Sequence, residues 1–275
     1  MSAHAGGMHL VGWARRIAAA LALAALAALT ACASKARVIS PIPDTVTPKP
    51  DLHEAAQYNV ELGVAYMERG DLALAQDKLN RALKENPRDP TVHSALALLD
   101  ERLGELDEAD RQFHTALHLA PHDPDVSNNF AVYLCRTHRV DQGVKRLIAT
   151  ARDPLYTTPE AAYTNAAVCL RTVHRDAEAE LDLERALALR PSFAEAVFQL
   201  ASLEMQQGKL ADARARIDRY IETYAATPDL LALGVRIAHA LGDPVAQQRY
   251  EQRLRVDFPN SPETRALASS SPNSG

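Results

Sequence analysis

Aromatic residues make up only 5% of this 275-residue chain, which argues against an aromatic-lined pocket or the core of a β-sandwich. No run rich in lysine and arginine follows residue 35, and the formal net charge is −5, so the electrostatic footprint of a nucleic-acid binder is missing. The apolar run at residues 17–29 has 13 residues, too few to span a bilayer. These absences leave a chain dominated by alanine and leucine, which suits closely packed helices.

The sequence also lacks the short motifs of common enzymes. It contains no Gly-rich phosphate loop, no His-Glu-x-x-His, no Gly-x-Ser-x-Gly and no Cys-x-x-Cys. His114 and His118 lie four residues apart on an expected helix, close enough to share a metal ion, but we favour the simpler interpretation of solvent-facing histidines. We therefore predict a protein that is not an enzyme and that uses no cofactor, metal or small-molecule substrate.

A unit of 34 residues occurs twice in register between residues 56 and 123. Five positions recur at this offset: Gly70 as Gly104, Leu72 as Leu106, Ala75 as Ala109, Ala82 as Ala116 and Pro87 as Pro121. Each unit is typical of two helices with the glycine in the turn between them and the proline after the second. Such a unit cannot bury its apolar face alone, so copies stack. The spacing resembles the tetratricopeptide repeat, which implies an all-α, right-handed α-solenoid of about six helix-turn-helix repeats.

We place the solenoid at residues 54–262 and expect irregularities in two of its repeats. The repeats fall at about 56–89, 90–123, 124–159, 160–193, 194–227 and 228–260. In the third, His138 replaces the turn glycine, Gly143 replaces an alanine of the second helix, and two extra residues fall in a loop at 151–159. In the sixth, Gly234 and Gly242 are eight residues apart instead of seven, so its register slips. The Ser-rich residues 263–275 are expected to be a disordered tail.

Residues 1–31 are expected to be a signal peptide that is removed, because Arg15 and Arg16 precede the short apolar run. Residues 29–32, Leu-Thr-Ala-Cys, resemble the lipobox of bacterial lipoproteins. That resemblance implies acylation (palmitate among the acyl chains) of Cys32 and, since no aspartate follows it, an outer-membrane address facing the periplasm. The alternative is an ordinary secretory signal that leaves Cys32 as a plain thiol. Residues 32–53 contain four prolines within ten residues and predict an extended tether.

Cys135 and Cys169 are the two remaining cysteines, and they lie 34 residues apart in the expected first helices of repeats three and four. After the two-residue insertion they differ by two repeat positions, or about 3 Å along neighbouring helices. The sulfurs are therefore within reach of each other, and the periplasm is oxidising. A disulfide and two separate buried thiols both fit; we take the disulfide as the working hypothesis.

By resemblance to other tetratricopeptide proteins, the first helices line a concave groove that binds a partner. The mixture of apolar and polar residues there would suit an extended peptide. The expected groove residues are Val60, Val64, Met67, Ser94, Leu98, Asn128, Asn129, Val132, Thr164, Asn165, Val168, Arg171, Phe198 and Met205. The pair of lysines that usually clamps a terminal carboxylate is missing. Leu155 and Tyr156, in the loop after repeat three, form a second candidate surface on the rim.

Several stretches of residues 52–263 resemble the PilF/PilW family, the outer-membrane lipoproteins of type IV pilus biogenesis. They are Tyr58-Asn-Val-Glu-Leu-Gly63, Asn128-Asn129-Phe130 through Cys135-Arg136, Asp153-Pro-Leu-Tyr156, Leu233-Gly-Val-Arg-Ile237 and Phe258-Pro-Asn-Ser-Pro262. The resemblance implies a pilotin, which binds secretin subunits and promotes their localisation and multimerisation at the outer membrane. The alternative is a tetratricopeptide lipoprotein scaffold of another envelope machine, for β-barrel assembly or the cell wall.

Overall fold

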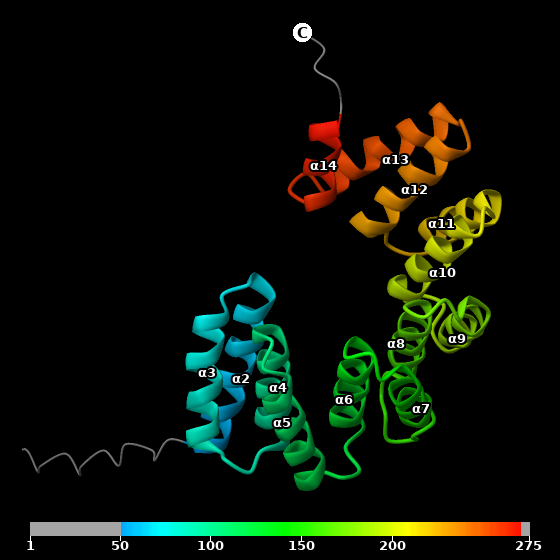
Figure 1. Cartoon of the computed structure of the whole chain (residues 1–275). Coiled ribbons are helices and arrows are strands. Elements are labelled where there is room, and N and C mark those ends of the chain that lie inside the picture. The colour runs from blue at the N-terminus through cyan, green and yellow to red at the C-terminus, as the bar shows by residue number, and fades with distance from the viewer. Residues whose placement is uncertain (1–50, 271–275) are drawn as a thin grey trace, which may run out of the picture. The chain divides into compact units, whose positions relative to one another are not determined.

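The computed structural model describes residues 51–270. The expected signal peptide, Cys32, most of the expected tether and residues 271–275 lie outside the described residues. Within 51–270 the chain forms thirteen α-helices and no strand. Twelve of them pair into six helical hairpins that follow one another along the chain (Figure 1). The prediction of an all-α tetratricopeptide solenoid is confirmed.

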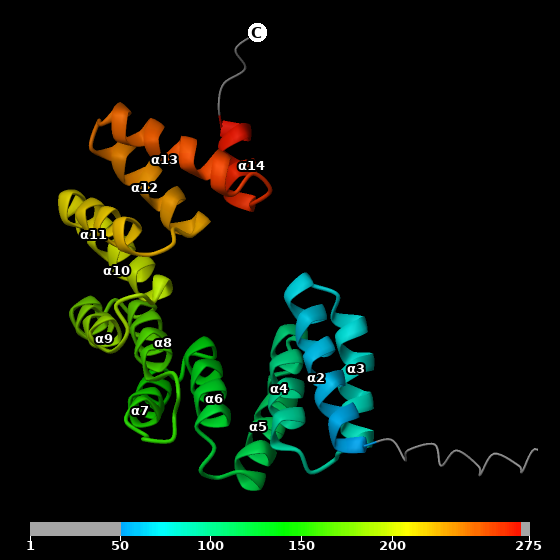
Figure 2. The ribbon, with the colours of Figure 1, turned by 180° about the vertical axis from the view of Figure 1, so that it is seen from behind.

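The hairpins stack through their first helices. These are α2 (Leu52–Arg69), α4 (Pro90–Leu103), α6 (Pro124–Arg136), α8 (Pro159–Arg171), α10 (Ala194–Gln206) and α12 (Pro228–Ala240). The second helices are α3 (Leu72–Glu85), α5 (Leu106–Leu119), α7 (Val140–Ala151), α9 (Asp176–Leu189), α11 (Leu210–Thr223) and α13 (Pro244–Asp257). Each first helix contacts the next first helix, and each second helix contacts the first helix of the following hairpin. The first helices therefore form a row of neighbours, which can be followed from both sides in Figures 1 and 2.

Local signals set the ends of the helices. At the start of α6 the carboxylate of Asp123 accepts hydrogen bonds from the N–H groups of Asp125 and Val126 at 2.9 and 3.1 Å, and Pro124 fills the first helical position, where no N–H is needed. At the end of α2, Gly70 adopts a left-handed backbone with φ 81° and closes the helix. Capping residues thus mark the hairpin boundaries that the sequence repeat predicts.

Two histidines occupy turn positions where other repeats have glycine. His138 and His174 have φ of 63° and 59°, close to the values of the turn glycines. The turns of repeats three and four therefore keep the left-handed geometry, although a β-carbon makes it less favourable. The replacement of glycine by His138 changes the strain of the turn and leaves its conformation unchanged.

A single rule pairs the two helices of every hairpin. A small residue in the first helix faces a large buried residue sixteen positions later in the second: Gly63 with Leu79, Ala97 with Phe113, Ala131 with Leu147, Ala167 with Leu183, Ala201 with Ile217, and Gly234 with Tyr250. A β-carbon added to Gly234 would lie 2.9 Å from the Tyr250 ring. The expected slip of register in the sixth repeat is therefore confined to the turn at Gly242, and its helices pack in register with the others.

Gly143 marks an unusually close approach between α6 and α7. A β-carbon at this position would lie 2.5 Å from the sulfur of Cys135 and 2.8 Å from the backbone oxygen of Ala131. The sulfurs of Cys135 and Cys169 are 2.03 Å apart, with their α-carbons separated by 5.5 Å. The close approach of both the Cys135 sulfur and the Ala131 backbone oxygen explains why this position holds glycine instead of alanine.

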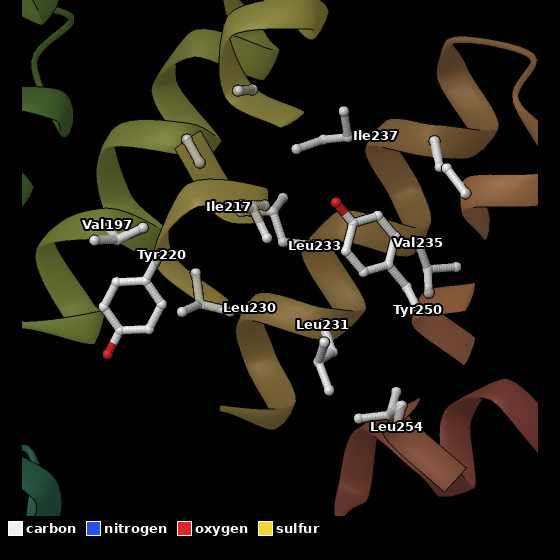
Figure 3. Close-up of a cluster of buried hydrophobic side chains, with 14 residues drawn as sticks. Val197, Ile217, Tyr220, Leu230, Leu231, Leu233, Val235, Ile237, Tyr250 and Leu254 are labelled. Atoms are coloured by element: carbon white, nitrogen blue, oxygen red, sulfur yellow. The ribbon is translucent and has the colours of Figure 1, made fainter. Parts of the chain in front are cut away.

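The last part of the fold corrects the expectation of a disordered tail from residue 263. Residues 262–270 form helix α14 (Pro262–Ser270), which contacts α12 and α13. Its Leu267 packs against the large cluster of buried residues shared by α10 to α13. Figure 3 shows part of that cluster, with the Tyr250 ring lying among side chains of α12 such as Leu233 and Val235. The helix covers apolar surface that the last hairpin would otherwise expose.

Candidate functional site

The groove expected along the first helices contains fewer accessible residues than the sequence predicts. Val60, Met67, Ser94 and Thr164 are all buried, so they cannot meet a partner in this conformation. Val60 and Met67 belong to the cluster between the first two hairpins, and the Thr164 hydroxyl donates to the backbone oxygen of Glu160 at 2.8 Å. These four assignments are wrong because the small residues around them let neighbouring helices approach closely.

The asparagines of the groove bond between hairpins. The side-chain amide of Asn129 donates to the hydroxyl of Ser94 at 3.3 Å, and that of Asn165 donates to the side-chain oxygen of Asn128 at 3.2 Å. These contacts join α4 to α6 and α6 to α8. These half-buried side-chain amides fix the positions of neighbouring helices. Because they already bond to each other or to Ser94, fewer of their donors and acceptors are left for the backbone of a bound peptide.

The open part of the groove lies between α8, α10 and α12. A hollow of about 350 Å³ is lined by Arg171, Phe198, Gln199, Ser202, Met205, Gln206, Leu233 and Arg236. All of these residues belong to first helices. A second hollow of about 320 Å³ adjoins it and shares Arg171 and Gln206, with Val168 on its wall. The predicted groove residues Val168, Arg171, Phe198 and Met205 are therefore brought together, while Val64, Leu98 and Val132 lie half-buried farther along the row.

The hollow exists because one position of the repeat changes its chemistry. The residue two places after the small residue of the first helix faces the preceding hairpin and is buried in four repeats: Leu99, Tyr133, Cys169 and Leu203. In the sixth repeat that position holds Arg236, whose side chain is exposed. A charged group is not buried without a partner, so α12 leaves space beside Met205 that an apolar residue would fill.

Arg171 lies at the meeting point of the two hollows and is held by uncharged groups. Its guanidinium donates to the side-chain oxygen of Gln206 at 3.0 Å, to the backbone oxygen of Gln199 at 3.4 Å and to the side-chain oxygen of Gln199. Burial lowers the pKa of the Arg171 guanidinium, an effect that the negative charge of Asp176 partly offsets. The site can therefore hold apolar side chains beside a fixed positive charge.

The rim loop between α7 and α8 divides into one buried and one exposed residue. Tyr156 packs into the cluster around α6 to α8 and is buried, so it does not form a binding surface. Leu155 is 72% exposed, and its backbone N–H bonds to the carboxylate of Asp153 at 2.8 Å. Only Leu155 remains as a candidate contact on the rim.

Another hollow, of about 610 Å³, lies between α5, α6 and α7. His114 and His122 line it, together with Phe130, Lys145 and Arg146. His118 does not line it. No group of three or more His, Cys, Asp or Glu side chains within the described residues is placed to hold a metal ion. None of the helices between residues 51 and 270 is long and apolar enough to cross a bilayer.

Sequence reasoning missed Leu233 and Arg236, because the sixth repeat was judged out of register. The signal that finds them is the sixteen-residue spacing from Gly234 to Tyr250, which aligns α12 with the other first helices. In that alignment Arg236 stands where four repeats have a buried residue. The exposed Arg236, at a position that is otherwise buried, therefore indicates where the hollow lies.

Comparisons with known proteins agree with this architecture. A tetratricopeptide-repeat family model matches residues 66–128 and 176–237. The type IV pilus assembly protein PilF of Pseudomonas aeruginosa is 25% identical over 208 residues, which cover 76% of this chain and 82% of PilF. The crystal structure of PilW, described as a widely conserved type IV pilus biogenesis factor, superposes with a TM-score of 0.59 at 30% identity, covering 78% of this chain and 98% of PilW.

Proposed function

Because this chain belongs to the PilF/PilW-like family of tetratricopeptide-repeat proteins of type IV pilus biogenesis, we propose that it binds subunits of the pilus secretin. It would act as a pilotin, bringing the subunits to the outer membrane and promoting their assembly into a multimeric channel. The binding is non-covalent and requires a surface for protein contact and a membrane address.

The observation that carries the proposal is the hollow around Arg171. The first helices place the apolar side chains of Phe198 and Met205 beside the positive charge of Arg171. No residue of the described chain fills the hollow between them. An extended segment of a partner could lay alternate side chains into such hollows. A rigid stack of hairpins holds the hollows in place, so little ordering is required on binding.

The membrane address is proposed to come from Cys32, which lies outside the described residues. Acylation at its sulfur and new amino group would place several chains in the bilayer, and each buried CH₂ contributes about 0.8 kcal/mol. A protein carrying Cys32→Ala is expected to bind secretin subunits and to fail to bring them to the outer membrane. If its fractionation matches that of the wild type, the anchor is wrong.

We also propose that the Cys135–Cys169 bond forms in the mature protein, since the two sulfurs are in bonding contact and the periplasm is oxidising. Mass spectrometry of the unreduced protein after blocking of free thiols tests this directly. Labelling at both Cys135 and Cys169 would exclude the disulfide.

The primary experiment measures secretin multimers in outer-membrane fractions with and without this gene. Multimers should be lost on deletion and return with the wild-type gene. Persistence of correctly placed multimers in the deletion strain would contradict the proposal and favour another envelope machine, such as that for β-barrel assembly or the cell wall.

A matched pair of variants tests the groove. Val168, 39% exposed, lines the groove beside Arg171, whereas Val245, 77% exposed, lies on the second helix α13. Val168→Glu should abolish capture of the secretin in a pull-down, while Val245→Glu should leave it unchanged. Equal capture by both variants would remove the groove from the binding surface.

A further inference from the structure

The hollow between α8, α10 and α12 contains two arginines and no acid on its wall. Arg171 and Arg236 both line it, on α8 and α12 respectively. Within the described residues, neither guanidinium forms an ion pair; Arg171 bonds only to amide oxygens. The nearby carboxylate of Glu195 accepts a hydrogen bond from the side chain of Gln199 at 2.8 Å. The hollow is thus a concentration of positive charge in a chain whose net charge is negative.

The charge of Arg171 is only partly compensated, because Asp176 acts on it without forming an ion pair. Taking a guanidinium partly out of water weakens its hydration, and neutral amides replace that hydration incompletely. A carboxylate is the group that compensates it best, because it accepts two parallel N–H bonds from the guanidinium fork. The apolar side chains of Phe198, Met205 and Leu233 line the same hollow and place apolar surface beside this charge.

We propose that this hollow recognises an acidic side chain, aspartate or glutamate, that is flanked by a large apolar residue within an extended segment of the partner. The inference rests on the proposed function and specifies the chemistry of the segment bound. The carboxylate would lie between Arg171 and Arg236, and the apolar neighbour would contact Phe198 and Met205.

The shape of the site favours an internal acidic residue over a chain terminus. The hollow continues past Arg171 into the adjoining one, which is lined by Val168, Thr172, His174 and Asp176. A bound segment can therefore pass through on both sides of the carboxylate. A site that binds a C-terminal carboxylate would instead be closed beyond the last residue of the bound peptide.

Peptide binding to the detergent-solubilised full-length protein tests the proposal. The probe is a fluorescein-labelled peptide of sequence Gly-Ser-Leu-Glu-Leu-Ser-Gly with a C-terminal amide, compared by fluorescence anisotropy with the same peptide carrying glutamine for glutamate. A third peptide carries the glutamine and a free C-terminal carboxylate. The glutamate peptide should bind roughly 10- to 100-fold more tightly than the glutamine peptide, and less tightly at high salt.

Two variants and one control assign the effect to the arginines. Arg236→Gln changes an exposed side chain that forms no ion pair within residues 51–270, and Arg171→Gln removes the half-buried charge. Each should weaken binding of the glutamate peptide by roughly tenfold or more. Arg88→Gln, an equal charge change in the exposed turn between α3 and α4, should leave it unchanged.

Three results would overturn the inference: equal binding of the glutamate and glutamine peptides, wild-type affinity in Arg236→Gln, or preference for the free C-terminal carboxylate. Capture of secretin subunits by the wild-type protein is measured in parallel. A protein that captures secretin without discriminating the peptides refutes only this inference. One that discriminates the peptides and captures no secretin refutes the proposed function.

Discussion

Single side chains decide how favourable the hairpin turns are. His138 and His174 adopt the left-handed conformation that Gly70, Gly104, Gly208 and Gly242 provide in the other turns. Both histidines are exposed, and their side chains form no hydrogen bond with the part of the chain that the structure describes. Their β-carbons therefore add strain that no contact offsets.

Replacing either histidine with glycine should stabilise the fold. We expect His138→Gly and His174→Gly each to raise the free energy of unfolding by about 0.5–1 kcal/mol, after allowing for the greater entropy of glycine in the unfolded chain. Urea unfolding followed by circular dichroism measures the change. The reverse substitution, Gly104→Ala, should lower stability; a gain there would show that turn strain is unimportant.

Asp100 is a second residue whose effect is local. It is 7% exposed on α4, and one of its carboxylate oxygens is buried without a hydrogen-bond partner. Burial first, and then the charges of Glu108 and Glu105, raise the pKa of Asp100 to about 6. The folded protein consequently holds a proton here that the unfolded chain releases near its ordinary pKa of about 4.

The pH dependence of Asp100 follows from the raised pKa. Its contribution to stability is fully present below pH 4 and is lost as the pH rises through 6, because the folded state must then bury a charge. Asp100→Asn should therefore raise the free energy of unfolding by about 1–3 kcal/mol at pH 7.5 and change it little at pH 4. Urea unfolding at the two pH values measures this, and an equal effect at both would contradict it.

At the scale of helices, α6, α7 and α8 form the most constrained group. The proposed Cys135–Cys169 bond would join α6 to α8, and Gly143 on α7 lies close to the Cys135 sulfur. A cross-link that closes a loop of 34 residues stabilises a fold by about 3–4 kcal/mol through the unfolded chain. With the proposed bond in place, α6 and α8 are held covalently as well as by packing.

Gly143→Ala should lower the free energy of unfolding by about 2 kcal/mol or more, since its β-carbon would overlap the Cys135 sulfur. In a Cys135→Ala/Cys169→Ala protein the loss should be smaller, because the nearest atom is gone. It should not vanish, because the backbone oxygen of Ala131 remains close. Thermal unfolding of the four proteins gives the coupling energy. Equal losses in both backgrounds would rule out the sulfur contact.

Features that are set within one hairpin could be predicted from the sequence, and features that depend on contacts between hairpins could not. The period of 34 predicts the hairpins, and Asp123 with Pro124 marks a helix start, because these signals act within one unit. The burial of Met67, Ser94 and Thr164 depends on how closely the next first helix approaches, which composition alone does not reveal. Asn129 is on the predicted face, and its bond to Ser94 could be inferred only after neighbouring helices were placed. Helix α14 was missed because a Ser-rich composition conceals Leu267, which packs against the last hairpin.

At the scale of the whole array, the apolar core is divided into clusters that follow the hairpins. One cluster joins α2 to α4, and another joins α10 to α13. Because each hairpin contacts only its neighbours, stability is close to a sum of hairpin and interface contributions. A destabilising substitution in the last hairpins should therefore leave the first hairpins folded.

Tyr250→Ala provides the test of this independence. Tyr250 is fully buried against Gly234, and its hydroxyl donates to the carboxylate of Asp218 at 2.6 Å. Its loss should destabilise the last two hairpins by about 3–5 kcal/mol. Hydrogen exchange should accelerate in α10 to α14 and remain at wild-type rates in α2 to α5. Val256→Ala, at an exposed position of α13, should leave both ends unchanged; faster exchange in α2 to α5 of Tyr250→Ala would show one cooperative unit instead.

The contact between Gly143 and the Cys135 sulfur also makes substitutions at these positions depend on one another. Alanine occupies the equivalent position in other hairpins, at Ala75, Ala109, Ala179 and Ala213, and at 143 its β-carbon would overlap a sulfur at 135. A cysteine at 135 is therefore accommodated more easily beside glycine than beside alanine. An exchange at any one of Cys135, Gly143 and Cys169 consequently changes the cost of an exchange at the others.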